Sequence, residues 1–274
     1  MNLIKYIYYF FFDYLILLRN LKKDKNFIII FPRFLSLLFG FVLLFDKKNK
    51  NFFRQFVRNK YDIITIHEIF GEESYNLTKF LIWKKVKKIF DEYLKNDKTP
   101  LLIDCGSNIS SSTEYFCRIF KGIFPIMIEP NAESLSFGKR NLSVLKFIKF
   151  DLPVACEKKI VKFDSTNEDN RANRISDLAG EKKETVTIND ILKDHQDKEP
   201  FILKIDIEGY EDNLFEKNYD WLNNFKIIII EIHDWMIPNK AISSNFFNAV
   251  SQLDKKRDII ISGENIILVK IDEK

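Results

Sequence analysis

The chain has 274 residues, of which 46% are hydrophobic and 30% are charged, and these values exclude a largely disordered protein. The length is sufficient for one large α/β domain with an appendage. The net charge of +4 is small and the basic residues are scattered, which excludes an extended surface for nucleic acid.

Residues 1–50 are predicted to form a hydrophobic, helical N-terminal segment, separate from a main domain over residues 51–274. Residues 2–20 place polar side chains along one helical stripe and apolar ones over the remaining surface, which is typical of an amphipathic helix. A second apolar run covers residues 27–45. Its uninterrupted part, residues 34–45, is shorter than the roughly 20 residues that a transmembrane helix needs.

The role of this segment has three interpretations. Its apolar face and the nearby lysines fit a helix that lies on a membrane surface. The same pattern fits helices that pack on the main domain or join copies into an oligomer, and it fits a true membrane span less well. Asp13 and the lack of a small-residue cleavage site argue against a signal peptide. We therefore expect a cytoplasmic protein, peripheral on the inner face of the cytoplasmic membrane under the first interpretation.

The cysteines and histidines indicate neither disulfides nor zinc. Cys105, Cys117 and Cys156 are odd in number and lack a C-x-x-C pair, which favours free thiols in a reducing compartment. The three histidines are dispersed without the spacing of zinc ligands. No metal site is predicted.

The main domain begins with elements of mixed character. We predict a helix over residues 52–58 and a β-type stretch over residues 63–66, where three isoleucines cluster. A long helix is predicted over residues 77–94, with its lysines on a solvated face.

From residue 100 onward, short apolar runs alternate with helical patterns. Such alternation predicts a mostly parallel sheet in a three-layer α/β fold, and the closing hairpin predicts one antiparallel edge strand. The predicted strands are 101–103, 124–128, 144–150, 185–188, 201–205, 227–230, 258–261 and 266–269. The predicted helices are 111–120, 132–141, 189–193, 210–217 and about 243–253.

Four of the predicted strands end in polar side chains, which are Asp104, Glu129, Asp206 with Glu208, and Glu231 with His233. In an open parallel sheet the carboxyl ends of the strands meet at one edge, where ligands bind. Glu129 ends the strand that follows the strand of Asp104, a position that suits a carboxylate accepting hydrogen bonds from both hydroxyls of a ribose. The sequence therefore predicts a cofactor cleft at this edge.

The segment after Asp104 is a turn of small residues that leads into a helix. Gly106 and the following serines let a ligand approach the backbone, and the helix N-terminus offers free N–H groups. The turn does not match the dinucleotide pattern G-x-G-x-x-G, because Asn108 and the serines stand where the later glycines would be. A strand-end acid before such a turn suits a cationic or hydroxyl-bearing ligand.

Four segments together resemble a known family. Ile-Asp-Cys-Gly-Ser-Asn-Ile at 103–109, Ile-Glu-Pro-Asn at 128–131, Leu-Lys-Ile-Asp-Ile-Glu-Gly-Tyr-Glu at 203–211 and Ile-Glu-Ile-His at 230–233 are similar, in order, to the signature segments of the FkbM family of methyltransferases. Enzymes of this family use S-adenosyl-L-methionine (SAM). The stretches 58–62 and 69–75 also resemble the family's lead-in, so the likeness covers about residues 55–270.

The resemblance implies a Rossmann-like class I methyltransferase fold, SAM as cofactor and O-methylation of a hydroxyl. By position in the matching motifs, Asp104, Gly106 and Asn108 are expected on the methionine side of SAM. Ser110, where many members carry glycine, belongs to the same loop. Glu129 is expected to bind the ribose, with Asn131 and Asp151 near the adenine, and Asp206 is expected to border the site of methyl transfer.

Methyl transfer is an in-line displacement, so much of the catalysis comes from holding the acceptor oxygen against the methyl group. His233 is the predicted base, because the unperturbed pKa of histidine lies near neutrality. Asp206 is expected to share this role or orient the acceptor, and Glu231 to fix the tautomer of His233. The competing interpretation is that His233 only caps the segment after its strand. Lys204 and Glu208 alternate around Asp206, so we expect at least one of them to face away from the cleft.

Residues 164–180 form a polar insertion between two sheet elements. Long irregular loops at a sheet edge often bind the acceptor or close the site, and Arg171 and Arg174 would then contact an anionic or glycan acceptor. The alternative is an ordinary surface loop.

The sequence thus predicts a SAM-dependent O-methyltransferase acting on a sugar, glycan or lipid-linked saccharide, as in polysaccharide biosynthesis. One alternative is a non-catalytic glycan-binding or assembly protein on the same fold. The other is a dinucleotide or nucleotide-sugar enzyme, against which the missing G-x-G-x-x-G and the Glu-Pro-Asn turn count.

Overall fold

A computed structural model describes residues 25–166, 169, 174–175, 180–236, 238–254 and 256–270. The amphipathic helix expected over residues 2–20 lies outside these ranges. Within them, no helix has the length and apolar character needed to cross a membrane. Cys105, Cys117 and Cys156 are buried free thiols, as expected from their number and spacing.

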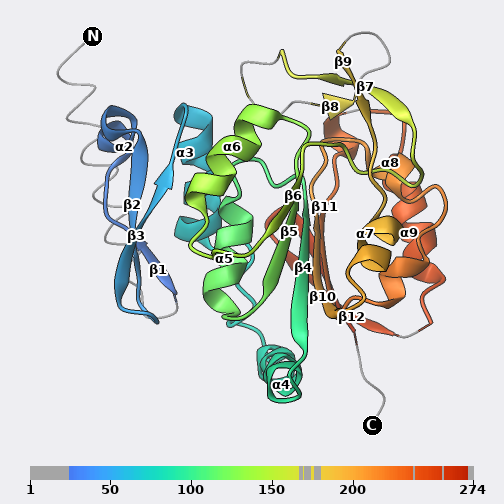
Figure 1. Cartoon of the computed structure of the whole chain (residues 1–274), viewed down its shortest axis with the longest axis horizontal. Coiled ribbons are helices and arrows are strands. Elements are labelled where there is room, and N and C mark those ends of the chain that lie inside the picture. The colour runs from blue at the N-terminus through green and yellow to red at the C-terminus, as the bar shows by residue number, and fades with distance from the viewer. Residues whose placement is uncertain are drawn as a thin grey trace.

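A sheet of seven strands forms the centre of the molecule (Figure 1). Its strand order is β12-β13-β11-β10-β4-β5-β6. The five strands from β11 to β6 are parallel, and β13 is antiparallel to both of its neighbours. The strands are β4 (Thr99–Cys105), β5 (Phe124–Ile128), β6 (Ile148–Phe150), β10 (Lys198–Ile205), β11 (Ile227–Glu231), β12 (Arg257–Ser262) and β13 (Asn265–Lys270). This arrangement confirms the class I methyltransferase fold with an antiparallel hairpin at the C-terminal edge.

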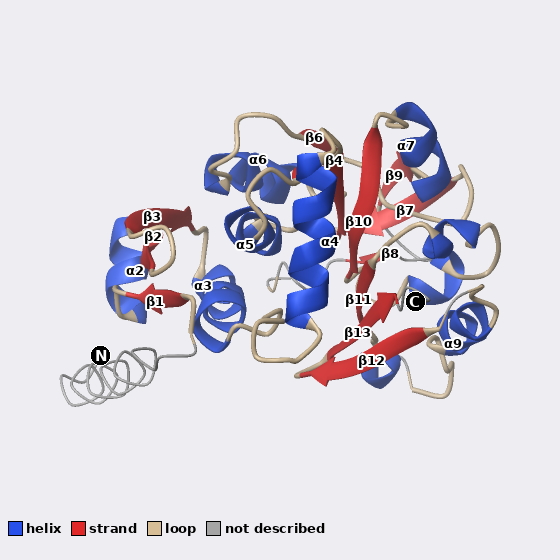
Figure 2. Ribbon diagram, turned by 90° about the horizontal axis from the view of Figure 1, so that it is seen from below, coloured by secondary structure: helices blue, strands red, loops and turns tan. Residues whose placement is uncertain are grey.

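Helices cover both faces of this sheet (Figures 1 and 2). One face carries α4 (Trp83–Lys95), α5 (Ser111–Ile119) and α6 (Ala132–Asn141), and the other carries α7 (Ile188–Asp194), α8 (Glu211–Leu214) and α9 (Ser244–Ser251). Because successive side chains of a strand point to opposite faces, Ile227 and Ile229 enter one hydrophobic core while Ile228 and Ile230 enter the other. The central strands are therefore apolar throughout, as their sequences predicted.

The N-terminal part of the described chain forms a small antiparallel sheet, which corrects two predictions. Residues 27–45 were expected to be helical, but they contain β1 (Phe27–Ile29), α2 (Arg33–Phe39) and most of β2 (Phe41–Asp46). Residues 52–58 were also expected to be helical, but β3 (Asn51–Phe56) pairs with β2 along its whole length. The predicted boundary at residue 50 therefore falls in a hairpin. Val42 and Leu44 are fully buried at a spacing of two, so burial on one face of a sheet outweighs the apolar composition that suggested helices.

This small sheet packs against α5. The ring of Phe27 lies 5.4 Å from that of Tyr115, and the guanidinium of Arg118 lies 3.5 Å from the centre of the Phe53 ring. Arg118 also bonds Glu114 at 2.6 Å and pairs with Asp46 at 3.4 Å, with all three side chains buried. Residues 27–56 thus belong to the same core as the central sheet.

The stretch around the three isoleucines is also helical, not extended. The α-helix α3 (Lys60–Ile66) continues directly into the π-helix η1 (His67–Glu72). The side chain of Asn59 caps α3 by accepting bonds from the N–H groups of Tyr61 and Asp62. Ile63 and Ile66 are buried one helical turn apart, so the tertiary core decides their conformation against the β-preference of isoleucine.

Several boundaries differ from those predicted. The helix α4 begins at Trp83 instead of residue 77. The strand predicted over 185–188 lies earlier, as β9 (Glu181–Glu184), because Thr187 caps α7 and starts that helix at Ile188. β9 joins β7 (Ile160–Asp164) and β8 (Arg174–Ile175) in a second small sheet. The short 3-10 helices η3 (Asp220–Asn223) and η4 (Asp234–Met236) lie on either side of β11.

Candidate functional site

A cavity of about 620 Å³ opens at the carboxyl ends of the parallel strands. The sheet register explains which residues meet there. Cys105, Ile128, Ile205 and Ile230 lie in one row across β4, β5, β10 and β11. The residues that follow them, Gly106, Glu129, Asp206 and Glu231, therefore lie side by side, and all four line the cavity. The chain reverses its direction of travel across the sheet between β4 and β10, which is where open α/β sheets bind ligands.

The loop between β4 and α5 approaches β10 so closely that only glycine fits at its start. Gly106 has φ +77°, and a Cβ there would lie 1.7 Å from the carbonyl oxygen of Asp206. Lys204 of β10 also contacts this loop, because its Nζ donates a hydrogen bond to the carbonyl oxygen of Gly106 at 2.9 Å. Gly106 thus fixes the distance between the two halves of the site.

Arg58 holds the next part of this loop. Its guanidinium forms a bidentate pair with Asp62 and donates to Asn108 Oδ1 at 2.9 Å and to Ser134 Oγ at 2.6 Å. Asn108 has φ 46°, a left-handed conformation that this side-chain bond helps to stabilise. The stretch 58–62, which resembles the start of the family's domain, therefore positions the loop beside the cavity.

Glu129 joins this loop to the end of β5. Its two carboxylate oxygens accept bonds from the backbone N–H of Asn108 at 2.9 Å and of Asn131 at 2.8 Å. Burial raises the pKa of Glu129 despite these two bonds. Each carboxylate oxygen keeps a second lone pair, so the side chain can still accept hydroxyl donors from a ligand.

Asp104 lies beneath the loop and is not among the residues that line the cavity. It is fully buried and accepts bonds from the hydroxyls of Ser112 and Thr113, both at 2.6 Å. Its other oxygen lies 3.3 Å from Lys204 Nζ. Asp104 therefore supports the loop from below, and its expected place on the methionine side of SAM stays a prediction.

Lys204 and Glu208 both line the cavity, which corrects the expectation that one of them faces away. β10 ends at Ile205, so strand alternation no longer applies to Glu208, whose φ of 54° turns the chain back. Lys204 Nζ also lies 3.2 Å from Asp206 Oδ2. Although burial opposes its charge, the carboxylates of Asp104 and Asp206 raise the pKa of Lys204 well above its ordinary value.

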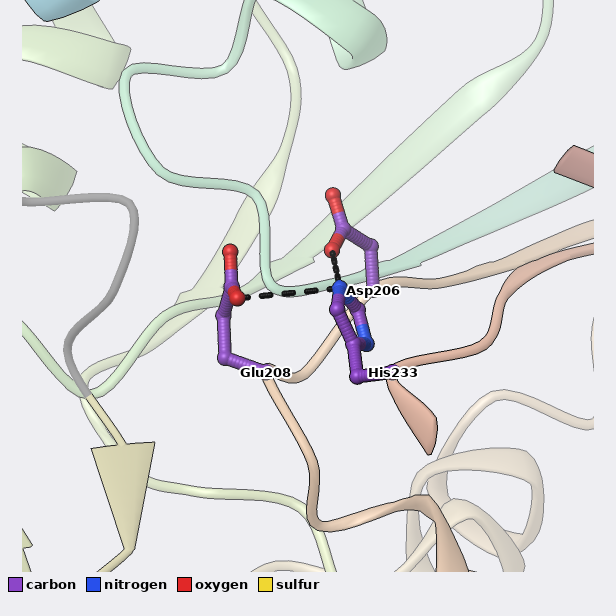
Figure 3. Close-up of side chains that lie close together, drawn as sticks. All are labelled: Asp206, Glu208 and His233. Atoms are coloured by element: carbon purple, nitrogen blue, oxygen red, sulfur yellow. Dashed lines mark ion pairs between the residues drawn. The ribbon is translucent and has the colours of Figure 1, made fainter. Parts of the chain in front are cut away.

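A dense group of ionisable side chains surrounds His233, just beyond the end of β11. Its Nδ1 lies 2.8 Å from Glu211 Oε1, and its Nε2 lies 3.6 Å from a carboxylate oxygen of each of three other side chains. Those three are Asp206, Glu208 and Glu231. Figure 3 shows the ion pairs that join His233 to Asp206 and to Glu208. Glu211, at the start of α8, is thus the carboxylate within hydrogen-bond distance of the imidazole, and the role predicted for Glu231 in fixing the tautomer stays a prediction.

The charges of this group move the pKa of His233 away from neutrality. Burial lowers it, but the carboxylates of Glu211, Glu231 and Asp206 outweigh burial and raise the pKa of His233 to about 11. Burial and the charge of Asp206 raise the pKa of Glu208 to about 8. These carboxylates therefore move the pKa of His233 away from the neutral range on which its prediction as a base was based, and its role as a base stays a prediction.

The remaining predicted cofactor residues do not line the cavity. Ser110 is buried, and its hydroxyl donates to Met127 Sδ at 2.9 Å and packs where Gly138 leaves space. Asn131 caps α6 by accepting a bond from Ser134 N–H. Asp151 is exposed after β6. Ser110 thus replaces glycine without narrowing the site, because its side chain points into the α6 packing.

Two features near the ends of β10 and β11 were not predicted from the sequence. Glu211 is the last residue of the segment 203–211 that resembles the family, but its contact with His233 depends on the conformation of the turn after β10. Trp235, in η4, is 70% exposed at the cavity rim, with its ring centre 6.4 Å from that of His233. From the polar insertion, Arg174 lines the cavity, whereas Arg171 lies outside the described residues.

The cavity fits the expected cofactor, SAM, on three observations. Its volume lies in the usual range for a cofactor pocket. The hydroxyl of Ser107 lines it and is buried without a hydrogen-bond partner among the described residues. Gly106, which has no side chain, and the carboxylate of Glu129, which can accept hydrogen bonds, both line the cavity. Gly106, Ser107, Asn108 and Glu129 are the residues that would hold the cofactor.

Comparison with known proteins identifies the family. The family model described as the methyltransferase FkbM domain matches residues 104–258, more than half of the chain. No curated protein matches. Solved structures similar to this chain include an O-methyltransferase from Bacillus cereus in complex with SAH (10% identity, 78% of this chain and 92% of that chain, TM-score 0.38).

Two further structures show comparable similarity. A precorrin-6y C5,15-methyltransferase from Geobacter metallireducens has 9% identity over 65% of this chain and 81% of that chain, with TM-score 0.34. The plantazolicin methyltransferase BpumL in complex with SAH has 12% identity over 77% of this chain and 99% of that chain, with TM-score 0.34. On the domain match and on the motifs that surround its cavity, the chain belongs to the FkbM family of methyltransferases, and SAM is its cofactor.

Proposed function

We propose that the protein transfers the methyl group of SAM to a hydroxyl of a sugar, glycan or lipid-linked saccharide. The cavity has two sides that suit this reaction. The β4 and β5 ends present Gly106, Ser107, Asn108 and Glu129, which would hold the cofactor. The β10 and β11 ends present carboxylates, an imidazole and an exposed tryptophan, which suit a hydroxyl-bearing acceptor.

The observation that carries the proposal is the cluster of ionisable side chains at the ends of β10 and β11, where Asp206, Glu208, Glu211 and Glu231 surround His233. SAM, when bound, supplies a methyl on a positively charged sulfur, and the S–CH₃ bond breaks as the new O–CH₃ bond forms. The acceptor hydroxyl must lose its proton in the same reaction, and the group at the ends of β10 and β11 is placed to receive it. Asp206 and Glu231 can also orient the hydroxyl by accepting its hydrogen bond.

The acceptor class rests on the cavity rim. The exposed face of Trp235 offers an apolar plane next to a polar wall, an arrangement that suits the C–H face and hydroxyl edge of a sugar ring. Arg174 adds a cation to the lining of the cavity, which suits an anionic saccharide such as a phosphate-linked one. These contacts favour a saccharide over a flat aromatic acceptor.

The cofactor half of the proposal is tested by calorimetric titration with SAM and with S-adenosylhomocysteine (SAH). We expect wild-type protein to bind SAH and Glu129→Ala to bind it at least tenfold more weakly. Glu133→Ala, which removes an exposed carboxylate from the start of α6, is the matched control. Binding of a nicotinamide dinucleotide in place of SAH would instead favour the dinucleotide enzyme.

The acceptor half is tested with methyl-labelled SAM and a panel of monosaccharides, nucleotide sugars and polyprenyl-linked saccharides. We expect label in a base-stable methyl ether of one saccharide class, and a rate at least 100-fold lower for His233→Gln. SAH binding without transfer to any of these acceptors would contradict the proposal and favour the glycan-binding or assembly role.

Contact with a membrane surface is part of the same proposal, because a lipid-linked acceptor lies there. Helix α2 exposes three apolar side chains in a row, Leu37, Leu38 and Phe39. Sedimentation of the full chain with phosphatidylglycerol vesicles tests this contact. Replacing the three residues by serine should release the protein, whereas Leu145→Ser, at a still more exposed leucine elsewhere, should not. Undiminished sedimentation of the triple variant would contradict it.

A further inference from the structure

Three side chains on the acceptor side of the cavity form a compact set of metal ligands. Asp206, Glu208 and His233 each present one ligand atom, and these atoms lie within 4.8 Å of one another. His233 Nε2 is 3.6 Å from Asp206 Oδ1 and 3.6 Å from Glu208 Oε2, beyond hydrogen-bond distance (Figure 3). Small side-chain shifts would bring them to about 3 Å apart, the spacing of neighbours around an ion with bonds of about 2.1 Å.

The imidazole is held in the orientation that a metal ligand requires. Glu211 is fully buried, and its Oε1 lies 2.8 Å from His233 Nδ1. A hydrogen on Nδ1 is thereby fixed toward Glu211, while Nε2 faces the two carboxylates of the cavity wall. Metal-bound histidines commonly carry such a carboxylate on the second nitrogen, which fixes the tautomer. This contact is independent of the convergence of acids and explains why the ring does not turn away.

The wall carries more negative charge than its cations neutralise. Asp206, Glu208 and Glu231 converge on one nitrogen, and Glu211 lies behind it. Lys204 pairs with Asp206 and with the buried Asp104. In the described part of the chain, neither Glu208 nor Glu231 makes a salt bridge to lysine or arginine. Glu208 and Glu231 are half-buried and share the single imidazole of His233 as an ion-pair partner, so a bound cation would offset negative charge that this imidazole does not.

The geometry points to a divalent cation bound by Asp206, Glu208 and His233 on the acceptor side of the cavity. Two carboxylates and one imidazole, with no cysteine in the cluster, favour an ion of the Mg²⁺ or Mn²⁺ type over one that prefers thiolate ligands. Three protein ligands leave coordination positions open to the cavity for an acceptor oxygen or water. The dispersed histidines of the sequence gave no indication of this site, because its other ligands are carboxylates.

The cation would change how the acceptor hydroxyl is activated. With Nε2 bound to the ion, His233 is a ligand and not a base, and the ion itself stabilises the alkoxide-like oxygen as the proton leaves to a free carboxylate such as Glu231. This use of the ion rests on the proposed methyl transfer. Binding of the ion does not, so the two can be tested separately.

The test is titration of the full-length, EDTA-treated and dialysed protein with Mn²⁺, followed by electron paramagnetic resonance of free Mn²⁺. We expect one Mn²⁺ per chain with micromolar affinity, displaced by millimolar Mg²⁺. Glu208→Gln and His233→Gln should weaken binding by about 100-fold, and Glu211→Gln by about tenfold, since it only orients the imidazole. Glu208 makes no hydrogen bond to other described residues, so its variant should fold as the wild type does, which circular dichroism melting checks.

Glu129→Ala separates this proposal from the cofactor assignment. It removes a carboxylate on the other side of the cavity, so it should lose SAH binding and keep Mn²⁺ binding, whereas Glu208→Gln should keep SAH binding and lose Mn²⁺. Failure of SAH binding alone would refute the cofactor assignment and leave the metal site intact. Absence of Mn²⁺ binding at millimolar concentration by folded protein, or equal binding by Glu208→Gln and the wild type, would overturn the metal site.

Discussion

Replacing Gly106 by alanine should damage the cofactor loop more than any other change of one methyl group. At φ +77° an alanine is strained by about 1 to 2 kcal/mol. In addition, its Cβ would lie 1.7 Å from the Asp206 carbonyl oxygen, where real contacts are not under 3.0 Å, so the two strand ends must separate. Forcing a methyl into packed structure costs a further 1 to 3 kcal/mol or so. We expect a total loss of about 2 to 5 kcal/mol.

The same separation should weaken the site. It stretches the bond from Lys204 Nζ to the Gly106 oxygen, now 2.9 Å, and moves Asn108 relative to Asp206. A displacement of about 1 Å at a reacting site can cost about 100-fold in rate. We therefore expect SAH affinity to fall by at least tenfold and methyl transfer by about 100-fold. Urea unfolding and SAH calorimetry on the same samples measure both effects.

Gly40→Ala is the matched control. Gly40 ends α2 with φ +71°, nearly the value at Gly106, but a Cβ there meets nothing within 4 Å. It should show the left-handed strain alone, about 1 to 2 kcal/mol, with normal SAH binding. If both variants lose the same stability and Gly106→Ala binds SAH like the wild type, the close approach of the two loops is not what the site depends on.

Three further predictions address the supports of the site. Arg58→Lys retains a positive charge but cannot span Asp62 and Asn108 together, so SAH affinity should fall by about tenfold with only a small drop in melting temperature; unchanged affinity would contradict this. Arg118→Met leaves Glu114 buried without its cation and should cost about 3 kcal/mol in urea unfolding, while a loss under 1 kcal/mol would refute the buried pair. Burial lowers the pKa of His67 to about 4 from 6.5, so the unfolded state binds the extra proton and stability falls as the pH drops from 6.5 toward 4. Between about pH 7.5 and pH 5 the wild type should lose about 2 kcal/mol more than His67→Gln, and an equal loss would exclude this role.

The parallel sheet was predictable because its strands are buried on both faces. Such strands must be apolar along their whole length, as in Ile-Ile-Ile-Ile at 227–230, and the polar residue that follows each run marks its carboxyl end. The register then needs no further information to bring Gly106, Glu129, Asp206 and Glu231 together, because parallel strands of similar length end at one edge. The position of the cleft could therefore be predicted from the sequence.

The N-terminal elements were not predictable in the same way. Residues 41–46 and 51–56 are apolar or mixed in composition, and only their pairing with each other and the packing of Phe27 and Phe53 on α5 fix them as strands. Ile63 and Ile66 favour strands locally, yet they lie in a helix because the core contacts one face of it. Such contacts join residues far apart in the chain, and no local pattern records them.

The sequence by itself determined the α/β alternation, the polar strand ends and the family motifs, because each depends on neighbouring residues and on a period of two or of 3.6. The tertiary structure alone decided that Asp104 supports the loop from below, that Glu211 holds His233, and that the pKa of His233 lies far from neutrality. Those properties depend on the distances between side chains that belong to different strands and turns. They exist only once the strand ends have met.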